Sequence, residues 1–321
     1  MKGHSDYGLR LLFRNSIPCT SQGVRQGDTI SPKLFTATLQ GIINRLDWED
    51  RGINIDGENL NHLRFADDIV IITDNANDLE SMLQTLSDES LKCGLKMNTN
   101  KTKVMFGPLT IPRPIRINNR DIEQVDEYVY LGQNFTLLHK SQDKEIQHRL
   151  KAGWSAFSKH KDIYKGNLPM CLKRKVFNAC VIPSITYGAE TWTLTTAMMT
   201  KLQSTQRRME RSMLSISLKD KKTCEWIRNK TGVKDVIDIA KINKWRWAGH
   251  VARLQDNRWT KRLTEWSALY GSRKRGRPVR RWRDELDDYW RHISWTRDAQ
   301  DRRKWKHHAE AFVQQWNQRA G

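Results

Sequence analysis

Apolar residues in the first 135 positions alternate with polar ones over several short runs and recur at helical spacing over two longer runs. The alternating runs predict strands near residues 53–55, 60–65, 69–72, 104–106, 116–117 and 128–131. The helical spacing predicts two amphipathic helices, one marked by Phe35, Leu39, Ile42 and Leu46 and the other by Leu79, Met82, Leu83 and Leu86. This mixture predicts an α+β unit in which helices cover one face of a small antiparallel sheet.

Local sequence signals set the expected ends of these elements. Ser31 has the position of an N-cap for the first helix, and Pro32 follows at the first helical position, where its missing amide costs nothing. Asn77 starts a capping-box pattern for the second helix, and Gly94 marks its C-terminal stop. Asp56-Gly57 predicts a hairpin turn between the first two strands.

From about residue 140 the apolar residues keep helical spacing and basic residues lie between them. The positions are Ile146, Leu150, Trp154, Phe157, Leu172, Val176, Cys180, Leu202, Met209 and Met213, and then Trp245, Trp247, Val251 and Leu254. This pattern predicts a bundle of helices. We expect three parts: an α+β unit at 1–134, helices at 135–215, and a basic, Trp-rich and mostly helical region at 216–321.

The charge is divided between the two halves of the chain. Residues 1–140 carry 16 Lys and Arg against 18 Asp and Glu, a balance of −2, while residues 141–321 carry 40 against 18, a balance of +22. Twelve of the thirteen tryptophans also lie beyond residue 150. Cations among flat rings suit a surface that neutralises phosphates and stacks on bases, although such rings also serve as helix core. A polyanion partner is therefore expected at the C-terminal half.

Other classes of protein are disfavoured by composition. No apolar run approaches the ~20 residues that span a bilayer, so we expect no membrane insertion. The five cysteines are scattered and odd in number, which favours neither a disulfide framework nor a structural zinc site. An intracellular location, nuclear or in a cytoplasmic ribonucleoprotein, is expected. His250, His307 and His308 lack cysteines at finger spacing, so we expect structural or surface roles for them.

The most basic segment is residues 273–283, in which seven of eleven residues are cations. An exposed loop is expected here, and its candidate backbone-binding residues are Arg273, Lys274, Arg275, Arg277, Arg280 and Arg281. General contact with an RNA or DNA backbone, nuclear import, and minor-groove contact by Arg275-Gly276-Arg277-Pro278 all remain open.

Two adjacent carboxylates, Asp67 and Asp68, fall at the expected bend between two apolar strands. Two like charges held this close stay ionised when a cation neutralises them, and hard oxygen ligands favour Mg²⁺, with Mn²⁺ as a substitute. A pair of such ions activates an attacking hydroxyl and stabilises a leaving oxygen in phosphoryl transfer. The alternative is an ordinary turn whose carboxylates accept backbone hydrogen bonds.

Several motifs, taken in order, resemble the palm of reverse transcriptases from non-LTR (LINE-type) retrotransposons. They are Gly23-Val24-Arg25-Gln26-Gly27-Asp28 with Ser31-Pro32, Phe65-Ala66-Asp67-Asp68, Gly94-Leu95-Lys96-Met97-Asn98 with Lys101, and Tyr130-Leu131-Gly132. Trp245-Arg246-Trp247-Ala248-Gly249-His250 and Gly276-Arg277-Pro278 resemble the C-terminal region of the same proteins, particularly their RTE-like branch. The resemblance covers nearly the whole chain.

The resemblance implies a partial polymerase palm at 1–134, a helical thumb at 135–215, and RNA-directed DNA polymerase chemistry on an RNA template, a DNA primer and deoxynucleoside triphosphates. It implies that Asp67 and Asp68 are metal ligands and that Lys101, or alternatively Lys103, assists the departing pyrophosphate as a general acid. The remaining implied roles are template or nucleotide binding by Gly23, Arg25, Gln26 and Gly27, and primer bracing by Tyr130, Leu131 and Gly132.

One departure from the family concerns a further catalytic aspartate, which the family places on a strand well before the glycine-rich segment. Asp6 does not fit that place, since too few residues separate it from Gly23. The family's fingers subdomain and N-terminal endonuclease also have no counterpart in this sequence. We therefore expect a C-terminal fragment that is inactive, or nearly so, by itself. The alternative is a non-catalytic RNA- or DNA-binding remnant that acts through its basic C-terminal half.

Overall fold

The computed structural model describes residues 9–14, 29–108, 110–137, 141–256, 258–266, 280–290 and 294–319, with side chains except at 9–14, 141 and 315–319. These residues form two compact units, Met1–Ser141 with Trp266–Gly271 (unit 1) and Gln142–Glu265 with Ser272–Gly321 (unit 2). Among the described helices, none combines the length and the apolar character that crossing a bilayer requires.

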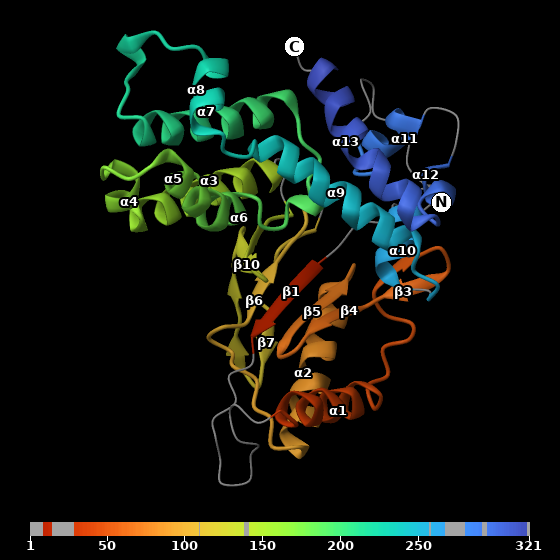
Figure 1. Cartoon of the computed structure of the whole chain (residues 1–321). Coiled ribbons are helices and arrows are strands. Elements are labelled where there is room, and N and C mark those ends of the chain that lie inside the picture. Colours follow the sequence, from red (N-terminus) through yellow and green to blue (C-terminus); the bar gives the residue numbers. More distant parts are fainter. Residues whose placement is uncertain are drawn as a thin grey trace. The chain divides into compact units, whose positions relative to one another are not determined.

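Unit 1 is a mixed α+β unit. Its helices are α1 (Ser31–Ile43) and α2 (Ala76–Lys92). Its strands are β1 (Leu9–Arg14), β2 (Ile53–Ile55), β3 (Glu58–Leu60), β4 (His62–Phe65), β5 (Asp68–Thr73), β6 (Lys103–Met105), β7 (Arg116–Ile117), β8 (Arg120–Asp121), β9 (Glu123–Gln124), β10 (Tyr128–Tyr130) and β11 (Gln133–Phe135). The main sheet has the order β4-β5-β1-β6-β9, and Figure 1 shows β1 between β5 and β6.

The expected sheet with helices on one face is present, with one difference. Apolar residues of α1, α2, β5 and β6 share a core that includes Leu39, Ile42, Ile69, Ile71, Leu79, Met82, Leu83, Leu86 and Val104. All pairings in the main sheet are antiparallel except the one between β6 and β9, which is parallel. The mixed helix-and-sheet architecture is compatible with a partial reverse transcriptase palm.

The expected helix ends are partly right. Gly94 follows α2 with a φ of +75°, and the amides of Gly94 and Leu95 donate to the carbonyls of Leu91 and Ser90, which closes the helix in a Schellman motif. The cap at the other end of α2 is Asn75, not Asn77. Asn75 accepts from the Asn77 amide because the helix starts at residue 76.

At α1 the expected cap is displaced by one residue. The N-cap of α1 is Ile30 and its side chain makes no capping hydrogen bond, so Ser31 is already helical and Pro32 is the second helical residue. The expected turn at Asp56-Gly57 is confirmed, since both residues have positive φ (49° and 85°) between β2 and β3. The apolar run at 60–65 is not one strand. It divides at Asn61, whose side-chain amide donates to the carbonyl of Trp48.

Unit 2 is helical. Its elements are α3 (Ser141–Lys159), α4 (Lys161–Lys165), α5 (Met170–Val176), the π-helical turn η1 (Phe177–Val181), α6 (Ile182–Ile185), η2 (Ala189–Thr191), α7 (Thr196–Met213), η3 (Leu218–Asp220), α8 (Cys224–Thr231), α9 (Val236–Ala252), α10 (Trp259–Glu265), α11 (Asp284–Trp290), α12 (Trp295–Asp298) and α13 (Arg302–Arg319). The helices expected from the spacing of apolar residues are present here as α3, α5, α7 and α9.

Two apolar cores occupy unit 2, and α9 contributes to both. The first joins α3, α5, η1 and α7 to the start of α9 through Val236, Ile237 and Ala240. The second packs Trp245 and Ala248 of α9 against Leu286, Trp295, Trp305 and Phe312. A division between two parts was expected at residue 215, but residues before and after that position share the first core. The division stays a prediction.

The second core depends on close contact between α9 and α13 (Figure 1). The indoles of Trp245 and Trp305 stack with centroids 3.9 Å apart, and each Nε1–H donates to the backbone carbonyl of the other residue. A Cβ atom at Gly249 would lie 2.3 Å from Nε1 of Trp305. Glycine at 249 is therefore what lets α13 approach α9 this closely.

Candidate active site

The pair of candidate metal ligands lies at the turn of the β4–β5 hairpin, as the sequence predicts. Phe65 pairs with Asp68, which leaves a two-residue turn of Ala66 and Asp67. Ala66 has a φ of +53°, a conformation that L-residues rarely adopt and that costs roughly 1–2 kcal/mol. Such strain accumulates at sites where a side chain must be aimed. Here the strained residue directly precedes Asp67.

Both carboxylates are accessible without being fully exposed, since Asp67 and Asp68 are half-buried. Ile69 and Ile71 of β5 face the core with α1 and α2, so by strand alternation Asp68 lies on the opposite face of the sheet. Asp67 belongs to the turn and is not bound by this alternation. The two donors suit Mg²⁺, which commonly takes one or two carboxylates and completes its shell with water and substrate phosphates.

Strand register places Lys101 at the same end of the sheet. Arg14 of β1 pairs with Asp68, and Leu12 of β1 pairs with Lys103. Lys101 lies in the turn just before the start of β6, and Arg14 is the last residue of β1, so Lys101 and Asp68 lie at the same end of the sheet. Lys101 is exposed, and its amide is fixed by the carbonyl of Asn98 at 3.1 Å.

The alternative lysine is engaged elsewhere. Lys103 donates to the carbonyl of Asn100 at 2.9 Å and forms an ion pair with Glu123. Within the described residues Lys101 has no ion pair of its own. Of the two candidates, Lys101 is therefore the one whose ammonium group is available.

The expected second hairpin is also present. Tyr130 pairs with Gln133, and Leu131 and Gly132 form its turn with φ values of +47° and +78°. Burial raises the pKa of the Tyr130 phenol, and the charge of Asp68 raises it further. The structure thus brings Tyr130 into the electrostatic range of Asp68, while the primer contact assigned to this hairpin stays a prediction.

Sequence reasoning gave no role of its own to Phe65, which precedes the turn. Its side chain is 62% exposed, and Val129 and Leu131 on the second hairpin are also exposed. Exposed apolar side chains of this kind, where they form one patch, mark a binding surface. The signal in the sequence was an aromatic residue directly before the turn.

Several predicted residues lie outside the described part of the chain. These are Gly23, Arg25, Gln26, Gly27, Arg273, Lys274, Arg275 and Arg277. Arg280 and Arg281 are described. Arg280 forms an ion pair with Asp288 at 2.8 Å, and the Arg281 amide donates to Asp284 at 2.7 Å, so both residues hold the start of α11.

The histidines singled out in the sequence are placed separately. His250 is exposed on α9, His307 is exposed on α13, and His308 is half-buried beside the ring of Trp290. In the described part of the chain, no group of three or more His, Cys, Asp or Glu side chains is arranged to hold a metal ion.

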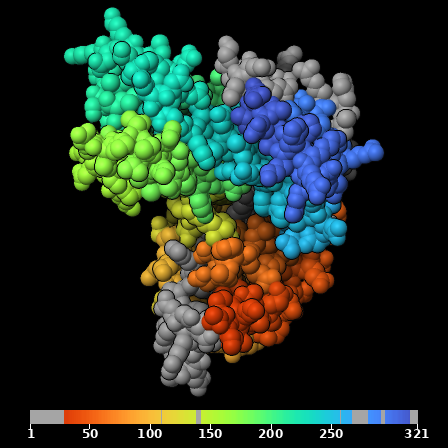
Figure 2. Space-filling model, viewed as in Figure 1, coloured from red at the N-terminus to blue at the C-terminus, as the bar shows by residue number. Residues whose placement is uncertain are grey.

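A basic groove in unit 2 was not foreseen. It has a volume of about 610 Å³ and lies between α7 and α8, whose surface is coloured green to turquoise in Figure 2. Four arginines and one carboxylate are among the residues that line it: Thr200, Gln203, Ser204, Arg207, Arg208, Arg211, Leu218, Cys224, Glu225 and Arg228. We call it the α7–α8 groove.

The four arginines of this groove differ in their partners. Arg207 and Arg228 both pair with the buried carboxylate of Asp235, at 2.9 and 2.8 Å. Arg208 and Arg211 have no ion pair within the described residues. These two cations are therefore available to an anionic ligand.

Comparison with known proteins identifies the family of the chain. A model of the reverse transcriptase (RNA-dependent DNA polymerase) family matches residues 12–135. A transposon-derived protein of Caenorhabditis elegans is 35% identical over 269 residues, which cover 79% of this chain and 96% of that protein.

Two Pol polyproteins from R2 retrotransposable elements are also similar. The one from Nasonia vitripennis is 28% identical over 127 residues, and one from Popillia japonica is 25% identical over 232 residues. The matches span 12% and 32% of those longer proteins. By these relationships and the motifs it carries, the chain belongs to the reverse transcriptases of non-LTR retrotransposons.

Proposed function

We propose that unit 1 is the part of a reverse transcriptase palm that holds divalent metal and the primer end, for templated addition of deoxynucleotides to a primer 3′-hydroxyl. The observation that carries this proposal is the strained β4–β5 turn, which holds Asp67 and Asp68 at the same end of the sheet as Lys101. Reverse transcriptases generally use divalent metals. Bound by Asp67 and Asp68, Mg²⁺ or Mn²⁺ would neutralise charge on the attacking and leaving oxygens.

The other residues of unit 1 take roles that follow from their positions. Lys101, which has no ion pair within the described residues, presents an ammonium group that can stabilise or protonate departing pyrophosphate. The hairpin of Tyr130, Leu131 and Gly132 offers an exposed apolar turn that can brace the primer. Gly23 and Gly27, with Arg25 and Gln26, would lie against the template and the incoming nucleotide.

We further propose that this chain extends a primer weakly by itself. In-line phosphoryl transfer with two metals needs more ligands than the two carboxylates of Asp67 and Asp68. In the described part of the chain, no third acidic, histidine or cysteine side chain joins them as a ligand group. A further carboxylate from elsewhere in the palm would complete the site.

Nucleotide binding tests the proposal without relying on synthesis. The chain bound to an RNA–DNA primer–template should bind dTTP in Mg²⁺, and Asp67→Asn should lose this binding. Asp56→Asn is the matched control, since it removes one carboxylate from the turn of a different hairpin and asparagine tolerates the positive φ there.

Equal dTTP binding by all three proteins would refute the metal role of Asp67. Primer extension on the same template gives the second readout. Little product is expected from this chain. Robust synthesis that Asp67→Asn abolishes would instead show that the carboxylates in this chain suffice.

The α7–α8 groove favours a second candidate function, nucleic-acid binding by unit 2 without catalysis. Within the described residues Arg208 and Arg211 line this groove without an ion pair. The half of the chain that contains the groove carries an excess of 22 positive charges. Phosphate contacts of this kind release counterions, which makes binding strongly salt-dependent.

Salt titration tests this second function. Arg211→Ala should reduce the slope of log K against log salt by about 0.9 for a duplex, because one phosphate contact is lost. Lys201→Ala is the control, since Lys201 lies on the same helix but pairs with Asp143 at 3.5 Å. If both variants keep the wild-type slope, the groove does not bind the backbone.

A further inference from the structure

The outward face of α9 carries four side chains in one strip: Asn243, Arg246, Trp247 and His250. They follow each other at spacings of three and four residues, so they lie along one side of the helix. The rest of the helix is turned inward, with Trp245, Ala248 and Val251 buried. Nothing in the packing of the two cores of unit 2 requires the aromatic and cationic character of this outward strip.

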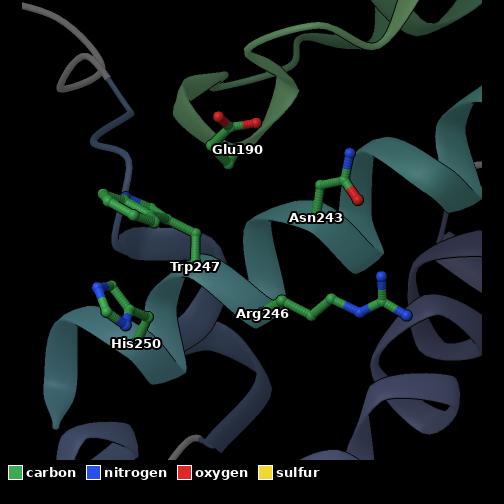
Figure 3. A pocket seen from close by; sticks show the side chains of 5 residues that line it. All are labelled: Glu190, Asn243, Arg246, Trp247 and His250. Carbon is green, nitrogen blue, oxygen red and sulfur yellow. The ribbon is translucent and has the colours of Figure 1, made fainter. Parts of the chain in front are cut away.

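The strip lines a shallow hollow of about 280 Å³, closed on its other side by Glu190 of η2. Figure 3 shows the indole of Trp247 between the carboxylate of Glu190 and the imidazole of His250, with Asn243 one turn earlier on the same helix. The rings of Trp247 and His250 lie 5.3 Å apart and are tilted by 33°. The hollow therefore combines flat rings with one amide and one carboxylate.

Trp247 differs from five other accessible tryptophans in what touches its ring. A Lys or Arg of the chain lies against the ring of each of Trp154, Trp226, Trp259, Trp282 and Trp290. Trp247 has no such cation against its ring in the described part of the chain. Within the described residues the one ring stacked near its half-buried indole is that of His250, and the exposed part of the indole is accessible to a planar ligand.

We infer that this hollow binds one unpaired nucleobase of a single strand. The base stacks on Trp247, the Asn243 amide and the Glu190 carboxylate meet donors and acceptors on its edge, and Arg246 contacts the neighbouring phosphate. Asn and Glu are side chains that hydrogen-bond base edges, and stacking on an aromatic ring accepts any base. The inference extends the second candidate function and rests on it, and it does not involve Asp67 or Asp68.

Binding of labelled 12-nucleotide RNA and DNA strands to the full chain tests the inference by fluorescence anisotropy. Trp247→Ala should weaken binding about tenfold, within the range for loss of one stacked base. Trp247→Phe, which keeps a ring, should recover most of the affinity. Comparing RNA with DNA, each with and without one abasic position, shows which strand supplies the base.

Controls separate stacking from general charge and from misfolding. Trp226→Ala removes a ring that the chain already covers with Lys222 and Lys230, so it should leave the affinity within twofold. Arg246→Ala should lower the salt slope by about 0.7 for a single strand, and Trp247→Ala should leave the slope unchanged. Circular dichroism melting confirms that each variant folds.

Equal affinity of wild type and Trp247→Ala, or an equal loss in Trp226→Ala, would overturn the inference. Absence of single-strand binding by the wild-type chain would overturn both the inference and the second candidate function. Loss of dTTP binding in Asp67→Asn concerns only the palm. The two proposals can therefore fail separately.

Discussion

Acidification from pH 7 to pH 4 should destabilise the hairpin that carries Asp67 and Asp68, because His62 must then take up a proton in a site that disfavours its charge. Burial, and to a smaller extent the cation of Arg64, lowers the pKa of the His62 imidazole from 6.5 to about 4. The neutral imidazole makes two contacts in the folded state. Its Nδ1 lies 2.6 Å from Oδ1 of Asn61, and its edge meets the ring of Trp48 at 5.7 Å.

The size of the effect follows from this difference in pKa. One pKa unit corresponds to about 1.4 kcal/mol, so the fall from 6.5 to about 4 corresponds to about 3 kcal/mol. This is an upper bound, since His62 is only half-buried. The folded-state pKa lies below the unfolded-state value. The stabilisation is therefore complete above pH 6.5, decreases as the pH falls toward 4, and is absent below that.

Hydrogen exchange of the peptide that covers residues 60–75 measures the local opening free energy at pH 7, 5.5 and 4. His62→Phe keeps the ring contact with Trp48 but cannot be protonated. At pH 7 it should lose about 1 kcal/mol with the hydrogen bond to Asn61. Between pH 6.5 and pH 4 the opening free energy of the wild type should fall by up to about 3 kcal/mol more than that of His62→Phe. The same pH dependence in both proteins, or a His62 pKa near 6.5 by NMR, would refute this reasoning.

Three further substitutions test the packing and the turn. Gly249→Ala should lower the free energy of unfolding by about 1–3 kcal/mol, because its Cβ would meet the buried Trp305. A Cβ at the helical Gly41 would have no atom within 4 Å, so Gly41→Ala should be neutral or stabilising. Urea midpoints that shift equally in the two variants would contradict this prediction. Ala66→Val should destabilise the β4–β5 hairpin by about 1–2 kcal/mol, since a β-branched residue fits a positive φ poorly, and hydrogen exchange that matches wild type would argue against the strained turn. Glu210→Ala should lower the free energy of unfolding by about 3–5 kcal/mol, because the buried cation of Arg207 loses its ion pair with Glu210. A melting temperature equal to that of the wild type would show that this ion pair does not stabilise the fold.

The features that local sequence determines were predictable. The hairpin at Asp67 and Asp68 follows from two apolar runs around a turn, and Asp56-Gly57 and Gly94 have the positive φ that their residue types favour. The order of motifs also identified the family. These signals depend on neighbours within a few residues of each other, so one sequence is enough to read them.

Features that depend on distant contacts were not predictable. β1 (Leu9–Arg14) is a central strand of the sheet, but its run of six residues shows no sign that it pairs with both β5 and β6. On α7 the charged Arg207 and Glu210 belong to a solvated face by composition, yet both are buried and form an ion pair. The α7–α8 groove and the α9 strip exist only because particular helices pack together.

Titration with Mn²⁺, followed by the relaxation of water protons, tests most directly whether the β4–β5 turn is a metal site. The wild-type chain should bind Mn²⁺ at a site that Mg²⁺ competes for and that Asp67→Asn abolishes, while Asp56→Asn leaves it intact. Because Mn²⁺ is paramagnetic, it should also broaden the NMR signals of residues 66–69 before those of other residues. Identical Mn²⁺ binding by the wild type and by Asp67→Asn would contradict the account of this turn as the metal-holding part of a reverse transcriptase palm.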